Sequence, residues 1–217
     1  MEPIILASSS PQRQEYFTML GLPFMVIRSS VEEIIDRKNI RRSVEELAMR
    51  KALNVSRLLC GEEHHRADAA PDTALIRNFA GSMPAANLWI AAADTIITIG
   101  GEIYGKPRDR EDAGKMLGIL QGRTHEVITA AALLNKGKNV SDCRSVASKV
   151  TFKQMSAAEI NWYLNTNEWE GAAGSYRVQG LASCFIGGIS GSFTSIAGLP
   201  LAEFYDMLRD NGYPYGG

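Results

Sequence analysis

Residues 88–93 form a near-continuous apolar run that ends abruptly in Asp94, and this run constrains the fold more than any other stretch. Apolar runs of this kind are typical of interior strands in α/β proteins, which are covered on both faces. A carboxylate at the edge of a core is costly unless a metal, a cation or hydrogen bonds compensate it. We therefore expect an interior strand with Asp94 at its exit. There the carboxylate either holds a divalent ion, accepts a proton from water, or caps a neighbouring loop.

Apolar runs and helical periodicities alternate along the rest of the chain, which predicts a mixed α/β fold. The expected strands are residues 3–8, 24–27, 96–99, 102–104, 127–134, 146–152 and 182–189, with a hairpin turn at Gly100-Gly101. The expected helices are residues 11–20, 43–60, 109–120 and 201–210, with one more beginning at Ser156. Residues 61–87 lack periodicity, so we expect an inserted loop or a mobile segment there.

Three helix starts carry capping residues. Ser10 can cap a helix whose first position is Pro11, and capping boxes are expected for Ser43 with Glu46 and for Ser156 with Glu159. On the second helix the apolar positions keep helical spacing, and Lys51 falls on the same stripe, seven residues after Val44. Such a lysine either extends its ammonium to solvent or projects into a cleft toward an anion.

Composition excludes several classes of protein. The chain has 217 residues, 45% hydrophobic and 22% charged, which suits one globular domain or two fused lobes. Its net charge of −1 gives no basic field for nucleic acid. Three cysteines without CxxC spacing suggest neither disulfides nor structural zinc. We find no signal peptide and no apolar run of about 20 residues, so we expect a cytoplasmic protein away from membranes.

Polar groups suited to phosphate follow two of the expected strands, at residues 8–10 with Arg13 and at Asp94-Thr95. Ser8, Ser9 and Ser10 lie at a helix N-terminus, where backbone N–H groups bind anions, and Arg13 can grip phosphate oxygens in two places. Lys106 stands before Pro107, which holds its backbone extended. Each feature alone also fits an ordinary cap, a solvated cation or a turn. The acidic pair Glu32 and Glu33 could likewise supply a metal ligand or simply be solvated.

Familiar phosphate and metal motifs are missing from the sequence. There is no Walker-type loop and no GxGxxG. His64 and His65 have no second ligand cluster at zinc spacing, and we expect His125 to be a structural hydrogen-bonding residue. The chemistry must therefore come from a constellation of separate segments.

That constellation resembles the Maf family through nearly the whole chain. The opening LASSSPQRQEYFTMLGLPF, the acidic VEE and the lysine-bearing ELAMRKA resemble the family's first blocks. AADTIITIGGEIYGKPRDREDAGKMLGILQGRTHEVITA resembles its central block, and GSYRVQG, ISGSF and AGLPL resemble its last. Short pieces such as GKP are weak signals, but several in order make chance agreement improbable.

The resemblance implies a single domain over residues 1–217, with an elongated mixed-sheet, ITPase-like α/β fold and a cleft between two lobes. It also implies a divalent metal (Mg²⁺, Mn²⁺ or Co²⁺), a homodimer, and hydrolysis of nucleoside triphosphates to monophosphate and pyrophosphate. Asp94 is then the base that activates water, and Glu33 lies with it near the metal. The remaining residues that the resemblance places in the cleft are Ser8, Arg13, Lys51, Lys106 and Gln179.

Three positions would set base specificity: Gln12, Thr95 and Gln179. Thr95 and Gln179 resemble the branch that favours dTTP and UTP, since the branch that favours methylated guanine nucleotides tends to carry other residues at these two positions. A glutamine amide can also donate to one pyrimidine carbonyl and accept from the ring N–H. The chain departs from the family where Gln12 replaces an arginine and where Gly171-Ala172 replaces a charged pair. The segment 61–87 also exceeds the usual connection. The alternative function is a nucleotide-binding regulator of cell division and septum formation with little catalysis.

Overall fold

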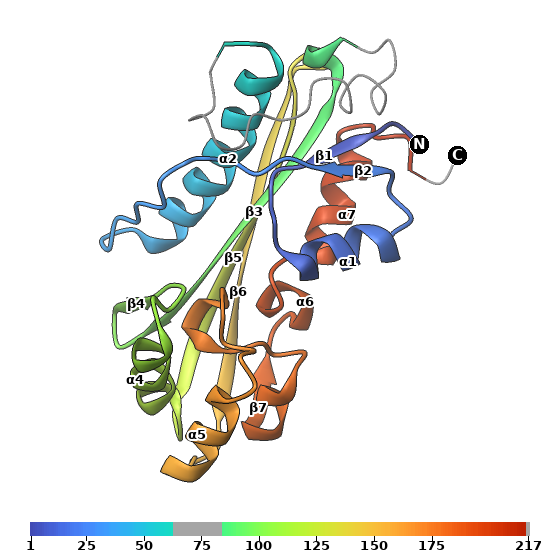
Figure 1. Cartoon of the computed structure of the whole chain (residues 1–217). Helices are drawn as coiled ribbons and strands as arrows, with labels where there is room; N and C mark the ends of the chain where they lie inside the picture. Colours follow the sequence, from blue (N-terminus) through green and yellow to red (C-terminus); the bar gives the residue numbers. More distant parts are fainter. Residues whose placement is uncertain (63–83, 216–217) are drawn as a thin grey trace.

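Three long antiparallel strands run through the molecule, and the other helices and strands are arranged around them (Figure 1). They are β3 (Trp89–Ile99), β5 (Thr124–Asn135) and β6 (Val140–Phe152). The computed structural model describes residues 1–62 and 84–215, so most of the segment 61–87 lies outside the described residues. Nearly every residue of β3 and β5 is buried, because both faces of this part of the sheet are covered.

Shorter strands extend the ribbon into a seven-stranded mixed sheet of order β2-β1-β3-β5-β6-β7. Strands β1 (Ile4–Leu6) and β2 (Phe24–Val26) pair parallel on one side, and β7 (Ile186–Ser190) pairs antiparallel on the other. Strand β4 (Glu102–Tyr104) pairs with the end of β3. Gly100 and Gly101 have φ of +61° and +84°, which glycine allows in a tight hairpin turn. The expected mixed α/β class and this hairpin are confirmed.

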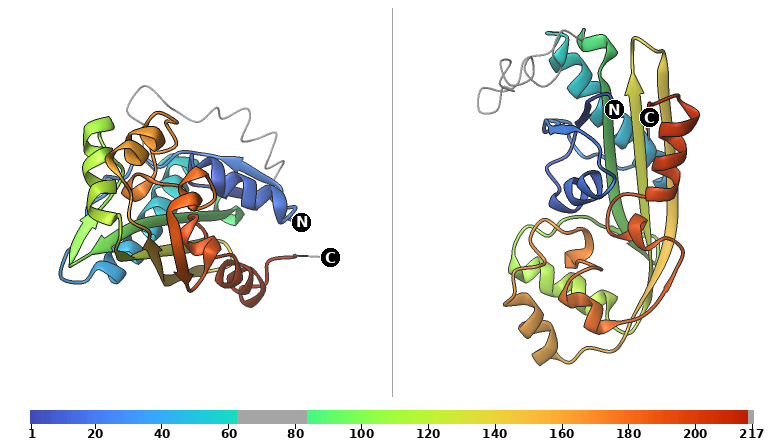
Figure 2. Two further views of the ribbon diagram at one scale, coloured as in Figure 1. Left: turned by 90° about the horizontal axis from the view of Figure 1, so that it is seen from below. Right: turned by 90° about the vertical axis from the view of Figure 1, so that its right-hand side faces the viewer.

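The helices gather at the two ends of the ribbon and form two lobes (Figure 2). One lobe holds α1 (Pro11–Met19), α2 (Ile40–Leu59) and α7 (Leu201–Asp210), and the other holds α4 (Arg110–Leu120) and α5 (Ala157–Leu164). The short α6 (Phe193–Ile196) lies between them (Figure 1). The 3₁₀ turns are η1 (Ala85–Asn87), η2 (Ala173–Ser175) and η3 (Leu181–Phe185). No described helix is long and apolar enough to cross a membrane.

Apolar side chains on both faces of the ribbon build the core. Helix α2 lays its stripe on one face, where Val44, Ala48 and Ala52 are fully buried beside residues of β1, β3 and β5. On the opposite face Phe17 of α1 packs against Phe204 of α7. The second lobe buries a separate cluster that includes Leu117 of α4. The cysteines are free: Cys60, Cys143 and Cys184.

Two expected helix starts differ from the structure. Helix α2 begins at Ile40, three residues earlier than expected, because the side chain of Asn39 accepts the capping bond from Arg42 N. The capping box at Ser43 is therefore wrong, and the Ser43 hydroxyl instead accepts a hydrogen bond from Asp36 N. Ser10 occupies the cap position of α1 without a capping bond. The box of Ser156 with Glu159 is confirmed, and the side chain of Asp109 caps α4 by accepting from Asp112 N.

The expectation that Asp94 ends a strand is also wrong. Strand β3 continues without interruption through Asp94 to Ile99, with Asp94 opposite Ala130 of β5. Ladder hydrogen bonds persist there because a cation compensates the carboxylate from the neighbouring helix, as described below. The strand expected at 182–189 is half right, since residues 181–185 form η3 and the strand begins at Ile186.

A buried aromatic group joins β5, β6 and the segment after η2. The rings of His125, Phe152 and Tyr176 pack edge to face, with centroids 4.8 to 5.4 Å apart. His125 is 2% exposed, and its Nε2 lies 2.8 Å from the Tyr176 hydroxyl, so its expected structural hydrogen bond is confirmed. Burial lowers the pKa of His125 from 6.5 to about 4.

The low pKa of His125 predicts a pH-dependent stability. Between pH 6.5 and about 4, His125 binds a proton in the unfolded chain but not in the folded chain. The free energy of unfolding is therefore highest above this window and decreases as the pH falls through it. The loss should reach about 3 kcal/mol across the window. Urea unfolding of the wild type and of His125→Gln at several pH values from 7 to 4.5 measures it. The prediction is contradicted if the free energy of unfolding changes equally with pH in the wild type and in His125→Gln.

Candidate functional site

A cavity of about 980 Å³ opens between the two lobes. Its walls come from the start of α1, the loop between β2 and α2, the middle of β3, the end of β4 and the segments 170–179 and 196–198. This size is at the upper end for small-molecule sites in proteins. Glu32 does not line the cavity, but the nine residues that the family resemblance assigns to the site do: Ser8, Gln12, Arg13, Glu33, Lys51, Asp94, Thr95, Lys106 and Gln179.

A buried ion pair lies at the centre of the cleft. Lys51 projects from the inner stripe of α2, and its Nζ lies 2.5 Å from Asp94 Oδ1 and 2.7 Å from Glu33 Oε1. Lys51 and Asp94 are only 8% and 6% exposed, whereas the Glu33 side chain is half-exposed on its loop. Of the two alternatives left open by the sequence, the structure therefore favours a lysine that projects into the cleft.

The two carboxylates differ in proton affinity because they differ in burial. Burial raises the pKa of Asp94 above its usual value, although the charges of Lys51 and Arg13 oppose the rise. Burial also acts on Glu33, but its hydrogen bond and ion pair with Lys51 outweigh it and lower the pKa of Glu33. Asp94 is thus the carboxylate better suited to take up a proton, as a general base must.

Arg13 is held in place by three segments of chain. Its Nη1 donates to Ser8 Oγ at 3.0 Å, its Nη2 to Thr95 Oγ1 at 3.2 Å, and its Nε to the Gly198 carbonyl at 2.8 Å. Gly198 has φ of +117°, a conformation open to glycine, and it brings its carbonyl under the guanidinium. Among the described residues, three of the five N–H donors of Arg13 have an acceptor, which leaves two for an anion.

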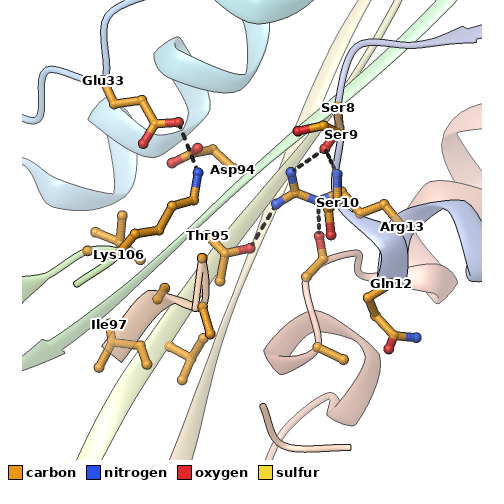
Figure 3. Close-up of a pocket in the computed structure, with 18 of the residues that line it drawn as sticks. Ser8, Ser9, Ser10, Gln12, Arg13, Glu33, Asp94, Thr95, Ile97 and Lys106 are labelled. Atoms are coloured by element: carbon orange, nitrogen blue, oxygen red, sulfur yellow. Dashed lines mark hydrogen bonds and ion pairs between the residues drawn. The ribbon is translucent and has the colours of Figure 1, made fainter. Parts of the chain in front are cut away.

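Figure 3 shows the cleft residues in two groups. Glu33, Asp94 and Lys106 lie on one side, with Lys106 Nζ 3.6 Å from Glu33 Oε1, and Arg13 lies with Ser8 and Thr95 on the other. Lys106 is more than half exposed, so it is free to follow a ligand. The cavity therefore has polar walls that face each other across the strand β3.

Sequence reasoning missed several lining residues: Arg28, Arg37, Tyr176 and Arg177. Arg28 and Arg37 lie in the loop between β2 and α2, and nothing in the local sequence distinguishes them from solvated surface arginines. Tyr176 and Arg177 could have been noticed, since they belong to the GSYRVQG segment that also carries Gln179. His64 and His65 lie outside the described residues.

The described residues contain no group of three or more histidine, cysteine or carboxylate side chains that could hold a metal by themselves. The cleft offers two carboxylates, Glu33 and Asp94, within reach of one ammonium. Mg²⁺ is usually held by one or two carboxylates together with substrate phosphates rather than by an all-protein cage. The donor set therefore fits a divalent ion that is shared with a phosphate ligand.

Comparison with known proteins identifies the family of this chain. The family model described as Maf-like protein matches residues 3–211. The chain belongs to this family. Two curated relatives, each named dTTP/UTP pyrophosphatase, come from Fusobacterium nucleatum subsp. nucleatum (35% identical over 97% of this chain and 96% of the relative) and Desulforamulus reducens (39% identical over 96% of each).

A solved structure described as that of the Staphylococcus aureus Ham1 protein superposes with a TM-score of 0.40. It is 16% identical, and the match covers 70% of this Maf-like chain and 72% of that chain. A likeness at this level carries no argument about the cleft or its chemistry.

The ion pair of Lys51 predicts a large loss of stability when the ammonium is removed. Lys51→Met keeps most of the side-chain volume but leaves the buried Asp94 carboxylate uncompensated, which should cost about 3 kcal/mol or more at pH 7. Adding Asp94→Asn should recover much of this loss. Urea unfolding measures the effect, with the exposed Lys106→Met as the matched control. The interpretation fails if Lys51→Met is no more destabilising than Lys106→Met.

Proposed function

We propose that this chain hydrolyses nucleoside triphosphates between the α and β phosphates, releases a monophosphate and pyrophosphate, and prefers dTTP and UTP. The observation that carries the proposal is Asp94, a buried carboxylate with a raised pKa at the centre of a cleft that is otherwise rich in cations. The names of the curated relatives support the same reaction.

Charge in the cleft favours a polyanionic ligand. The cationic lining residues outnumber the acidic ones, although the whole chain carries a net charge of −1. The cations are Arg13, Arg28, Arg37, Lys51, Lys106 and Arg177, and the carboxylates are Glu33, Asp94 and Glu170. A cleft lined mostly by one sign of charge concentrates ligands of the opposite sign. Cations placed beforehand also stabilise the charge that develops as a phosphoanhydride breaks.

Asp94 is proposed as the base of the reaction. It would accept a proton from a water molecule as that water attacks the α phosphorus, and the bridging oxygen would depart with pyrophosphate. Lys51 keeps the carboxylate in place through its 2.5 Å contact, and the unoccupied donors of Arg13 would hold phosphate oxygens. Lys106, being exposed, would close on the triphosphate from the β4 side.

A divalent metal, Mg²⁺, Mn²⁺ or Co²⁺, belongs to the proposal. Glu33 and Asp94 would hold it together with the substrate, since these two carboxylates are close enough to share one cation, Lys51. When bound, such an ion neutralises phosphate charge and makes a coordinated water more acidic. Removal of the ion by a chelator should therefore weaken turnover more than folding.

The preference for dTTP and UTP rests on three lining residues, Gln12, Thr95 and Gln179. Gln179 is exposed in the cavity, where its amide could donate to one pyrimidine carbonyl and accept from the ring N–H. Thr95 holds its hydroxyl beside Arg13. The single domain, the cytoplasmic location and the homodimer expected from the sequence remain predictions.

The alternative, a nucleotide-binding regulator with little catalysis, needs the cations but not a base. Asp94→Asn separates the two functions, because it keeps the side-chain shape and leaves Lys51 paired with Glu33. We expect kcat for dTTP to fall by about 10² to 10⁴ while the thermal midpoint changes little. Asp206→Asn on the exposed face of α7 is the control. Activity within a few-fold of the wild type would return Asp94 to a structural role, and release of orthophosphate would contradict α–β cleavage.

Base preference is tested by kcat/KM for dTTP, UTP, CTP, GTP and 7-methyl-GTP. We expect dTTP and UTP to lead. Gln12→Arg restores the cation that the family carries at this position and should raise kcat/KM for dTTP, while Gln14→Arg, on the same helix but outside the cavity lining, should not. A clear preference for 7-methyl-GTP would contradict the proposed preference for dTTP and UTP. Equal changes of kcat/KM in Gln12→Arg and Gln14→Arg would show that position 12 has no special role.

A further inference from the structure

Tyr176 is a cavity-lining residue that the proposed reaction does not use. It is 5% exposed and lies in the same segment as Gln179. Its ring is fixed edge-on between His125 and Phe152, and its hydroxyl lies 2.8 Å from His125 Nε2. A buried hydroxyl that His125 holds at a fixed position has a defined direction for any further hydrogen bond, and the residue that carries it lines the ligand cavity.

The direction of the bond between His125 and Tyr176 follows from the other ring nitrogen. His125 Nδ1 is buried and has no partner among the described residues. An orphaned buried N–H is rarer and more costly than an orphaned lone pair, so Nδ1 is the bare nitrogen and the single proton of the neutral ring sits on Nε2. His125 Nε2 therefore donates to the Tyr176 oxygen.

Because the Tyr176 oxygen accepts from His125, its own proton is available to a second partner. No described residue is recorded as accepting it. Burial raises the pKa of Tyr176, so the group stays a neutral phenol and acts as a donor. The ligand that it can serve must offer an acceptor.

The neighbours of Tyr176 indicate which part of a nucleotide lies there. Apolar residues of the cavity wall, Val127, Val178 and Ile97, belong to the same buried cluster as Tyr176. A neutral donor among apolar side chains suits a flat base with polar edge groups, whereas phosphates are served by the cations around Asp94 and Arg13. Uracil and thymine present carbonyl oxygens at their edges.

We propose that the Tyr176 hydroxyl donates a hydrogen bond to a carbonyl oxygen of the pyrimidine base, and that His125 is the positioning residue that directs this donor. The inference rests on the proposed preference for dTTP and UTP and adds a base contact to it. His125 itself touches no substrate and acts through Tyr176.

The first test removes the hydroxyl alone. Tyr176→Phe should raise KM for UTP and dTTP by about five- to tenfold with kcat nearly unchanged, because one neutral hydrogen bond to the bound base is lost. Replacing the base carbonyls in turn, with 2-thio-UTP and 4-thio-UTP, locates the contact, since sulfur is a weak acceptor. The wild type should discriminate against one analogue, and Tyr176→Phe should lose that discrimination.

The control variant is Tyr213→Phe, which also removes a buried hydroxyl but one that donates to the Glu2 carbonyl and lies outside the cavity lining. It should lower the thermal midpoint without changing the ratio of UTP to thio-UTP. His125→Gln keeps a donor near Nε2 and should retain most of the selectivity, whereas His125→Leu should behave like Tyr176→Phe. The inference is overturned if Tyr176→Phe discriminates between UTP and its thio analogues as the wild type does. It is also overturned if the variants lose this discrimination only in proportion to the fall in their thermal midpoints.

Binding of α,β-imido-dUTP, measured by calorimetry for the same variants, separates this inference from the proposed hydrolysis. If the wild type binds the analogue more tightly than Tyr176→Phe by the expected factor but does not hydrolyse dTTP, the proposed function fails and the base contact stands. If the wild type hydrolyses dTTP and both proteins bind the analogue equally, the base contact fails alone.

Discussion

The contact of Lys51 with Asp94 ties helix α2 to the middle of strand β3 and fixes the floor of the cleft. The Asp94 carboxylate is buried to an extent that water cannot compensate, so it requires Lys51 in one relative position of helix and strand. The same ammonium draws in Glu33 from the loop between β2 and α2. Helix packing, loop position and the proton affinity of the central carboxylate thus depend on one lysine.

The long strands explain how the two lobes can present opposite walls of a single site. Strands β3, β5 and β6 pass through both lobes, and their ladders are continuous across the cleft. Residues such as Asp94 and Thr95 are therefore fixed to a rigid element, while the cations of the exposed loops can adjust to a ligand. This division places the proposed base, Asp94, on the scaffold and would leave substrate capture to the more adaptable segments.

Local patterns in the sequence predicted elements well but misplaced what depends on tertiary partners. Helix α7 occupies 201–210 as expected, because amphipathic periodicity is a local property. The break assigned at Asp94 was wrong because the cation that compensates this carboxylate inside the strand, Lys51, lies 43 residues earlier and cannot be paired with it from the local sequence. The apolar stripe that contains Lys51 indicated that this side chain could point inward, but it did not indicate that Asp94 and Glu33 would be its partners. Arg28 and Arg37 gave no local sign, since only the folded chain brings them to the cavity.

The glutamine at position 12, in place of the arginine expected from the family, lowers the positive charge of the cleft less than the sequence suggests. The resemblance to the family implies a cation where this chain has Gln12, yet Arg28 lines the same cavity, and the described residues include no carboxylate that pairs with Arg28. Coulomb attraction for a triphosphate depends on the summed charge around it more than on any one contact. Hydrogen bonds, by contrast, depend on the position of the donor, so Arg28 cannot make the bonds that an arginine at position 12 would make. The substitution at 12 therefore alters how a ligand is oriented more than whether an anion enters.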